Sequence, residues 1–458
     1  MVPLVPTYFS DWKDTLLRPR IKKGEYAQFA AQAEHREVLG RLSLKNTLHH
    51  ALQTFPREAY LFILASLMNS VGSALMWPLT TIYVHNVLHR SYGEAGFVLF
   101  CQSLAGVAGQ FLGGALFHRL GAKRLIVGSL FLTGFAQFGL IFAKAWSPYI
   151  AMMTTVGLLN SITMPAVNAF IGFRWRDQQY RLFNAIYVSN NIGVAIGTSI
   201  AGVLAAISFN LTFLFNGVST VAFAAFFYVF IRRMNIDETS DLSLGVPLQG
   251  AEQSIRFLLG DYRLYLFISL GTMLISVSTS AWNSGVAPFL NQKGLSVTSY
   301  SLLWTVNGLV ILLGQPLLAL LNRFVMKTLY LRLIGSAVFY AIGFSFMLFW
   351  HGLYFDFVFG MVVATLGEMS ISPTSPALIT QTAGRAAPFY LGLVGGFGSA
   401  GRLIGPVLFG NLFDFFGLNP ILTIAAGSTV VAAILFLVHQ NVKTRVNSPL
   451  QNDSTLSV

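Results

Sequence analysis

Long apolar runs, separated by short polar stretches, occupy most of the chain. A helix that crosses the hydrocarbon of a bilayer needs roughly 20 such residues, and twelve runs are long enough. They lie at roughly 59–85, 93–117, 123–143, 148–172, 183–208, 211–231, 262–290, 299–321, 328–350, 353–380, 388–412 and 418–439. The pattern predicts an all-α polytopic membrane protein with twelve transmembrane helices.

The longest polar stretch between runs divides them into two sets of six. It contains Asp237-Glu238-Thr239-Ser240-Asp241 and then Gly and Pro, a composition typical of linkers. We therefore expect two six-helix pseudo-symmetric bundles. The expected organisation is a basic cytoplasmic N-terminal tail (1–58), a first bundle (59–231), a cytoplasmic linker (232–261), a second bundle (262–439) and a cytoplasmic C-terminal tail (440–458).

Charge is scarce, and its distribution predicts the topology. Only 10% of the 458 residues are charged, against about 25% in soluble domains, which excludes a water-soluble globular enzyme. Of the 29 Lys and Arg residues, only Arg90, Lys144 and Lys293 fall in the expected outer loops. Cytoplasmic loops collect basic residues, so both termini are expected in the cytoplasm. The net charge of +12 then needs no nucleic acid, and the basic tail is expected beside the lipids of the cell membrane.

Weak internal repeats relate the two sets of runs. Gly193, Gly197 and Gly202 in the fifth run match Gly401, Gly405 and Gly410 in the eleventh at an offset of 208 residues, as does Pro165 with Pro373. Gln102 and Gln110 in the second run repeat the spacing of Asn307 and Gln315 in the eighth. Repeats of this kind are typical of transporters that bind substrate between their halves.

The loop after the second run carries a family signature. It contains Gly114, His118, Arg119, Gly121, Lys123 and Arg124. This loop resembles the signature of the major facilitator superfamily, with His118 at the position of the usual acid. The resemblance extends over about 59–439, and the segments 367–373 and 401–410 resemble bacterial multidrug efflux members of the drug:proton antiporter type. It implies alternating access, with these loop residues acting in gating.

One acid and one base lie well inside the predicted spans. Glu368 is in the tenth run and Arg402 in the eleventh. Intramembrane charges usually face the bundle interior and act in function, so we assign both residues to proton coupling and hypothesise that they form a buried pair. A static structural pair is the alternative. The sequence has no phosphate-binding Gly-rich loop ending in Gly-Lys-[Ser/Thr] and no His or Cys cluster, so neither a cofactor nor a metal is expected.

Polar residues at helical spacing predict a central cavity between the halves. Thr272, Ser276, Thr279 and Asn283 follow steps of three and four in the seventh run. Their expected companions in the cavity, from the other runs, are Asn69, Ser73, Trp77, Gln102, Asn160, Tyr187, Asn191 and Asn307. Individual Ser and Thr residues could instead bond their own backbone.

These features favour a secondary active transporter over an enzyme, because a clustered nucleophile or acid–base set is missing from the runs. We expect proton-coupled export of small lipophilic or amphipathic compounds by a monomer. Its partners would be a small-molecule substrate, protons and membrane lipids. The alternatives are proton-coupled uptake of a nutrient or peptide and the flipping of a lipid-linked head group; a membrane-embedded enzyme or a sensor is disfavoured.

Overall fold

The computed structural model describes residues 55–76, 79–233, 262–295 and 297–447. The chain divides into two compact units, Met1–Leu61 and Phe62–Val458. Of the first unit, only residues 55–61, at the start of the first described helix, are described. The N-terminal tail to residue 54, most of the linker, the end of the C-terminal tail and Trp77 lie outside the described residues.

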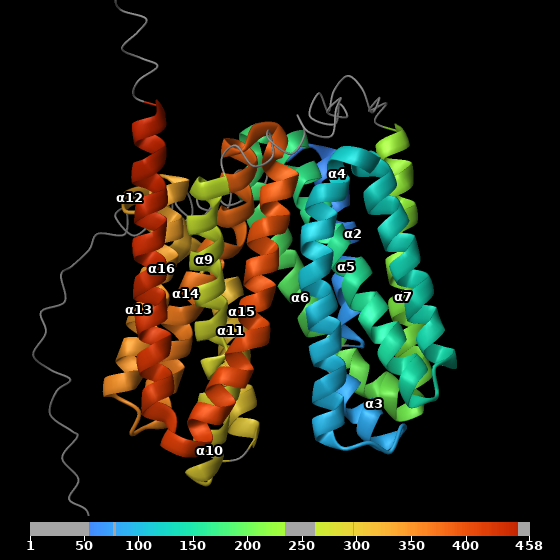
Figure 1. The fold of residues 1–458 in the computed structure, drawn as a ribbon, viewed down its shortest axis with the longest axis horizontal. Helices are drawn as coiled ribbons and strands as arrows, with labels where there is room; N and C mark the ends of the chain where they lie inside the picture. The colour runs from blue at the N-terminus through green and yellow to red at the C-terminus, as the bar shows by residue number, and fades with distance from the viewer. Residues whose placement is uncertain (1–54, 77–78, 234–261, 296, 448–458) are drawn as a thin grey trace, which may run out of the picture. The chain divides into compact units, whose positions relative to one another are not determined.

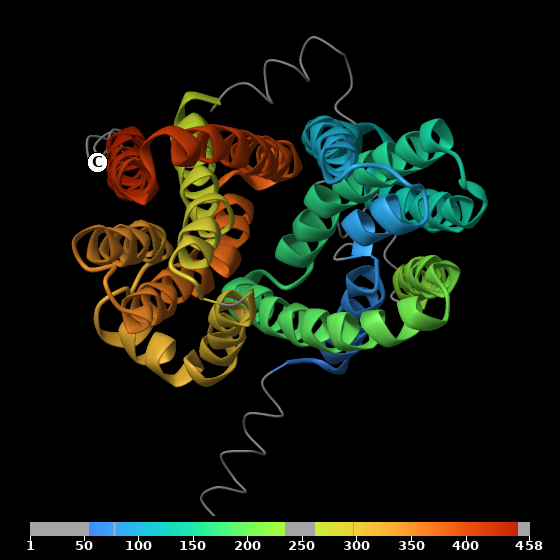
Figure 2. The same cartoon turned by 90° about the horizontal axis from the view of Figure 1, so that it is seen from below.

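The described part of the first half consists of helices. They are α2 (Arg57–Ala74), α3 (Thr80–Asn86), α4 (Tyr92–Phe142), α5 (Trp146–Arg174), the 3₁₀ turn η2 (Arg176–Gln178), α6 (Gln179–Ile207) and α7 (Phe209–Arg233). From Phe62 onwards these helices form a first bundle, in which α4 packs against α5 and α7. Figure 2 shows this bundle in blue and green beside a second group of helices in yellow to red.

The second half forms its own bundle, in which α13 packs against α14 and α16, and α9 against α15 and α16. Its elements are α9 (Tyr262–Thr279), the π-helical turn η3 (Trp282–Val286), α10 (Ala287–Gln292), α11 (Val297–Leu313), α12 (Gln315–Phe324), α13 (Leu329–Phe349), α14 (Tyr354–Thr382), the 3₁₀ turn η4 (Gly384–Ala386), α15 (Ala387–Phe416) and α16 (Leu418–Asn447). The short helices α3 and α10 lie at the lower end in Figure 1. The long helices run from there to the opposite end, where Gly121, η2 and η4 lie. We call this the upper end.

Helix α4 contains two of the predicted spans. A straight helix of its 51 residues would measure about 76 Å, more than twice the roughly 30 Å hydrocarbon core. The helix breaks at Gly121, whose φ of 74° and ψ of 163° are not helical. Only glycine adopts this backbone conformation readily, so Gly121 is where the chain turns back.

Other predicted spans are interrupted. The first run is divided between α2 and α3, and the eighth between α11 and α12, which are bent by 58°. By length and hydropathy, nine helices of the described residues can cross a membrane, or ten if α11 and α12 form one span. The all-α polytopic fold is therefore confirmed, while the count of twelve stays a prediction.

The glycine repeat has the same packing role in both bundles. A Cβ atom on Gly197 would overlap the Val71 carbonyl of α2, and one on Gly193 would lie 2.8 Å from that of Leu67. In the second bundle, Gly401 meets the Met273 carbonyl of α9 in the same way, and Gly405 meets Ser280 and Val277. The fifth and eleventh runs thus approach the first and seventh through matched glycines, as small residues allow between membrane helices.

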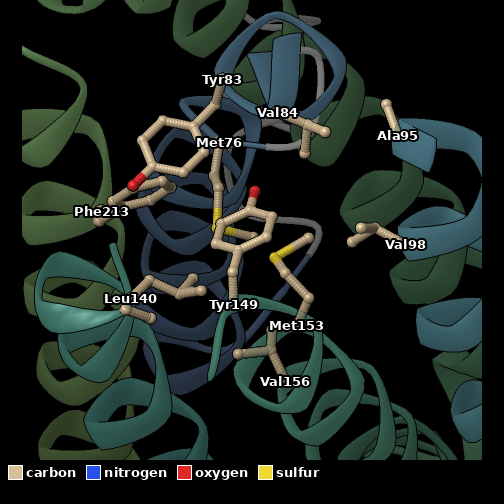
Figure 3. Packing of buried hydrophobic residues seen from close by; sticks show 11 residues of the cluster. Met76, Tyr83, Val84, Ala95, Val98, Leu140, Tyr149, Met153, Val156 and Phe213 are labelled. Atoms are coloured by element: carbon tan, nitrogen blue, oxygen red, sulfur yellow. The ribbon is translucent and has the colours of Figure 1, made fainter. Parts of the chain in front are cut away.

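Aromatic packing closes the lower end of the first bundle. The rings of Tyr83 in α3, Tyr149 in α5 and Phe213 in α7 meet at this end, with Tyr83 5.0 Å from both of the others by ring centroid. Met76, Leu140 and Met153 are buried in the same cluster (Figure 3). This buried cluster joins elements that are far apart in the sequence.

Candidate functional site

A cavity of about 400 Å³ lies in the second bundle, among α9, η3, α11, α13, α14 and α15. Its volume is within the range of small-molecule sites. The lining is largely apolar and aromatic, with Ile275, Trp282, Trp304, Tyr340 and Met361 among its members. Hydroxyl and amide groups are contributed by Thr272, Ser276, Thr279, Thr365, Ser372, Ser375 and Asn307, and charged groups by Glu368 and Arg402.

Glu368 receives a hydrogen bond on each carboxylate oxygen. Tyr187 of α6 donates its hydroxyl to Oε1 at 2.9 Å, and Asn307 of α11 donates its amide to Oε2 at 3.0 Å. The same Asn307 amide lies 2.9 Å from the hydroxyl of Thr365. One of these two donors, Tyr187, comes from the other bundle. The Glu368 carboxylate therefore takes part in a contact between the bundles.

Arg402 does not pair with Glu368. Its guanidinium Nη2 donates to the hydroxyl of Ser399, one turn earlier in α15, at 2.9 Å. Both charged residues lie in the described part of the chain, and no ion pair joins them there. The predicted buried pair is thus wrong for this conformation. The physical reason is that Tyr187 of α6 and Asn307 of α11 satisfy the carboxylate, while the guanidinium bonds Ser399 in its own helix.

Hydrogen bonds along one face of α6 join the two bundles. Tyr180, Asn184 and Tyr187 follow steps of four and three, so their side chains lie on the same face of the helix. Tyr180 accepts from Asn322 of α12 at 3.0 Å, Asn184 donates to Gln315 of α12 at 2.9 Å, and Tyr187 reaches Glu368. We call these three contacts the α6 ladder. It extends from the depth of the cavity toward the upper end.

The signature loop lies at the same end. A Cβ on Gly114 would come within 2.7 Å of the Pro388 carbonyl, so α4 touches the start of α15 there. His118 is buried, and its Nε2 has no hydrogen-bond partner among the described residues. Arg119 and Arg124 are exposed, and Lys123 lies over the ring of Tyr228 at 5.4 Å. The two bundles therefore meet at the upper end through this loop as well as through the α6 ladder.

The structure separates the residues that the sequence assigned to one central cavity. Thr272, Ser276, Thr279 and Asn307 line the observed cavity. Asn283 instead accepts a hydrogen bond from Tyr300 at 2.6 Å.

The expected residues of the first bundle do not line this cavity. The Ser73 hydroxyl donates a hydrogen bond to the backbone carbonyl of Ser70, and the Asn191 amide donates one to that of Tyr187. Asn160 is exposed, and the backbone and stem of Gln102 pack on Gly157. The buried Oδ1 of Asn69 has no partner among the described residues.

Sequence analysis missed Tyr180, Asn184 and Asn322. A signal was present, because positions 180, 184, 187 and 191, at the start of the fifth run and just before it, all carry polar or Tyr side chains at helical spacing.

Comparison with known proteins identifies the family. The sequence matches the Major Facilitator Superfamily over residues 62–350 and again over 268–457. The chain belongs to the Major Facilitator Superfamily (MFS). It is therefore a multi-pass membrane protein of a transporter family, in agreement with the resemblance drawn from the signature loop.

Relatives of this MFS chain include bacterial transporters. The MFS-type transporter YttB of Bacillus subtilis is 34% identical over 365 residues, which cover 80% of this chain and 90% of YttB. The quinolone resistance protein NorA of Staphylococcus aureus is 22% identical, covering 82% of this chain and 95% of NorA. The crystal structure of the human organic anion transporter MFSD10 superposes with a TM-score of 0.64 at 14% identity, covering 83% of this chain and all of that one. The structural similarity to MFSD10 shows the fold alone.

Proposed function

We propose that this MFS transporter is a proton-coupled exporter of small lipophilic or amphipathic compounds, with Glu368 as the proton-binding group. The observation that carries the proposal is the position of Glu368, which lines an apolar cavity and receives a hydrogen bond from Tyr187 of the opposite bundle. A similarity to the quinolone resistance protein NorA, at 22% identity, supports an efflux role.

The upper end is the cytoplasmic end in this proposal, because the loops there carry most of the basic residues. The protein acts as a monomer in the cell membrane with both termini in the cytoplasm. The bundles meet at the upper end through the α6 ladder and the signature loop. This arrangement corresponds to the conformation that is closed toward the cytoplasm.

Protonation of Glu368 from the outside would weaken both charge-assisted bonds, since a neutral carboxyl is a poorer acceptor. The Tyr187 contact between the bundles would weaken with it, which would favour opening toward the cytoplasm. There Glu368 would release its proton and cargo would enter the cavity. Proton entry and cargo exit are coupled if the two species occupy the site in turn.

The test is proton movement that depends on cargo. The full chain is reconstituted in proteoliposomes with a pH-sensitive dye inside, and a panel of amphipathic cations, neutral compounds and anions is added. The proposal predicts that transported compounds drive proton flux in the opposite direction. Transport of a compound with proton flux in the same direction would instead indicate symport, and transport that is indifferent to the pH gradient would overturn proton coupling.

A further inference from the structure

The cavity contains a cation, Arg402, that forms no ion pair with any of the described residues. Arg402 remains charged at any ordinary pH, and its hydrogen bond goes to the neutral hydroxyl of Ser399. Glu368, the other charged residue of the lining, is bonded to Tyr187 and Asn307. Charged residues inside membrane proteins usually face a partner or a water-filled cavity and mark substrate pathways, and Arg402 is exposed and lines this cavity.

A second polar group of the cavity lies close to Arg402. The hydroxyl of Thr272 in α9 is buried, lines the cavity and has no hydrogen-bond partner among the described residues. Both residues border Gly398, since a Cβ there would lie 3.3 Å from Cγ2 of Thr272 and 3.9 Å from Nη1 of Arg402. Gly398 thus places no side chain between the guanidinium and the Thr272 side chain, and both groups can donate hydrogen bonds.

We propose that Arg402 and Thr272 form an anion-binding subsite and that the cargo is an organic anion with an apolar, aromatic body. The guanidinium would hold a carboxylate or sulfonate through charge-assisted bonds, with the Thr272 hydroxyl as an additional donor. Ile275, Trp282 and Trp304 on the cavity wall would contact the ring system. The inference names the substrate class of the proposed exporter and so rests on the cavity being its transport site.

The experiment compares three ligands of one shape. Purified full-length protein in phosphatidylcholine nanodiscs is titrated by calorimetry with 2-naphthoate, neutral 2-naphthamide and cationic 2-naphthylmethylamine, without any gradient. A hydrogen bond to a charged group contributes about 1.5–3 kcal/mol, so 2-naphthoate should bind about tenfold or more tightly than the amide. Equal binding of the acid and the amide, or no binding of 2-naphthoate up to about 1 mM, the weak end of substrate affinities, overturns the inference.

Variants assign the preference to the two residues. Arg402→Gln should abolish the preference for the acid, Arg402→Lys should keep part of it, and Thr272→Val should weaken 2-naphthoate binding several-fold. Lys144→Gln removes an exposed cation from the loop between α4 and α5 and is the matched control. If Arg402→Gln does not fold, Arg402→Lys and Thr272→Val test whether the preference for the acid depends on the subsite. An undiminished preference in the folded variants overturns the subsite.

Two further arms separate related explanations. If phosphatidylglycerol in the nanodiscs displaces 2-naphthoate, the anion bound is a lipid head group, which overturns the assignment of a soluble cargo. If the wild type shows no preference for the acid but still exchanges protons for another compound, the proposed export stands and this inference falls. If it prefers the acid but transport does not depend on protons, the subsite stands and proton coupling falls.

Discussion

Tyr187 and Glu368 are joined across the two bundles, with the tyrosine hydroxyl 2.9 Å from Oε1 of the carboxylate. The two residues are 181 positions apart in the sequence, so the contact exists only when the bundles are together. A titratable group held by the opposite bundle can couple proton binding to a change in bundle arrangement.

Tyr187→Phe removes this hydroxyl and keeps the ring. Loss of a hydrogen bond to a charged group costs about 1.5–3 kcal/mol, which changes the ratio of the two bundle arrangements by about tenfold or more. We expect a reduction of about tenfold in uphill transport, measured as the initial rate in proteoliposomes under a pH gradient. Tyr300→Phe removes a hydroxyl that bonds Asn283 within the second bundle and should leave the rate near that of the wild type. Equal rates in both variants would contradict a coupling role for Tyr187.

The α6 ladder should open during transport. Asn184 and Gln315 lie 2.9 Å apart through their side-chain amides, so Asn184→Cys and Gln315→Cys together, with Cys101→Ser, should react with a short bifunctional thiol reagent. The crosslink should arrest transport, and reduction should restore it. Asn184→Cys with Asn411→Cys is the control, since Asn411 is exposed near the lower end of α15. A crosslinked protein that transports at the reduced protein's rate would show that this contact does not open.

Gly197 and Gly405 should not tolerate larger side chains. A Cβ at either position overlaps the facing helix, and overpacking of this kind costs about 1–3 kcal/mol. Gly197→Leu and Gly405→Leu should therefore lower the melting temperature of the purified protein. Gly202→Leu and Gly410→Leu are the controls, because no atom of a neighbouring helix lies within 4 Å of a Cβ at either position. Unchanged melting of the first pair would contradict the close approach of these helices.

Gly121→Ala should destabilise the turn inside α4. The φ of 74° and ψ of 163° are a conformation that costs other residues about 1–3 kcal/mol. Gly128→Ala lies in the helix beyond the turn with open space around its Cβ and should be neutral or stabilising. Thermal unfolding of both variants in detergent tests the difference, and similar melting temperatures would argue against a strained turn.

Local patterns in the sequence predicted much of the fold. The apolar runs predicted the helices, because the hydrocarbon core sets the length of a spanning segment. The glycine repeat predicted equivalent roles for the fifth and eleventh runs, and Gly197 and Gly405 indeed face α2 and α9. Helical spacing likewise predicted that Thr272, Ser276 and Thr279 share a face, and all three line the cavity.

Partners between helices could not be predicted in this way. A sequence shows which residues share a helix face, but the helix that this face meets depends on tertiary packing. Glu368 and Arg402 are on consecutive predicted spans and carry opposite charges, which suggested a pair. In the structure Tyr187 and Asn307 satisfy the carboxylate instead, through contacts 181 and 61 residues apart in the sequence.

The central claim, that Glu368 carries the coupled proton, is tested most directly by Glu368→Gln. The amide keeps the size of the side chain but cannot exchange a proton, so the variant should bind cargo and exchange it across proteoliposome membranes while failing to concentrate it against a gradient. Asp414→Asn neutralises an exposed acid on α15 and should concentrate cargo like the wild type. Uphill transport by Glu368→Gln at the wild-type rate would contradict the account.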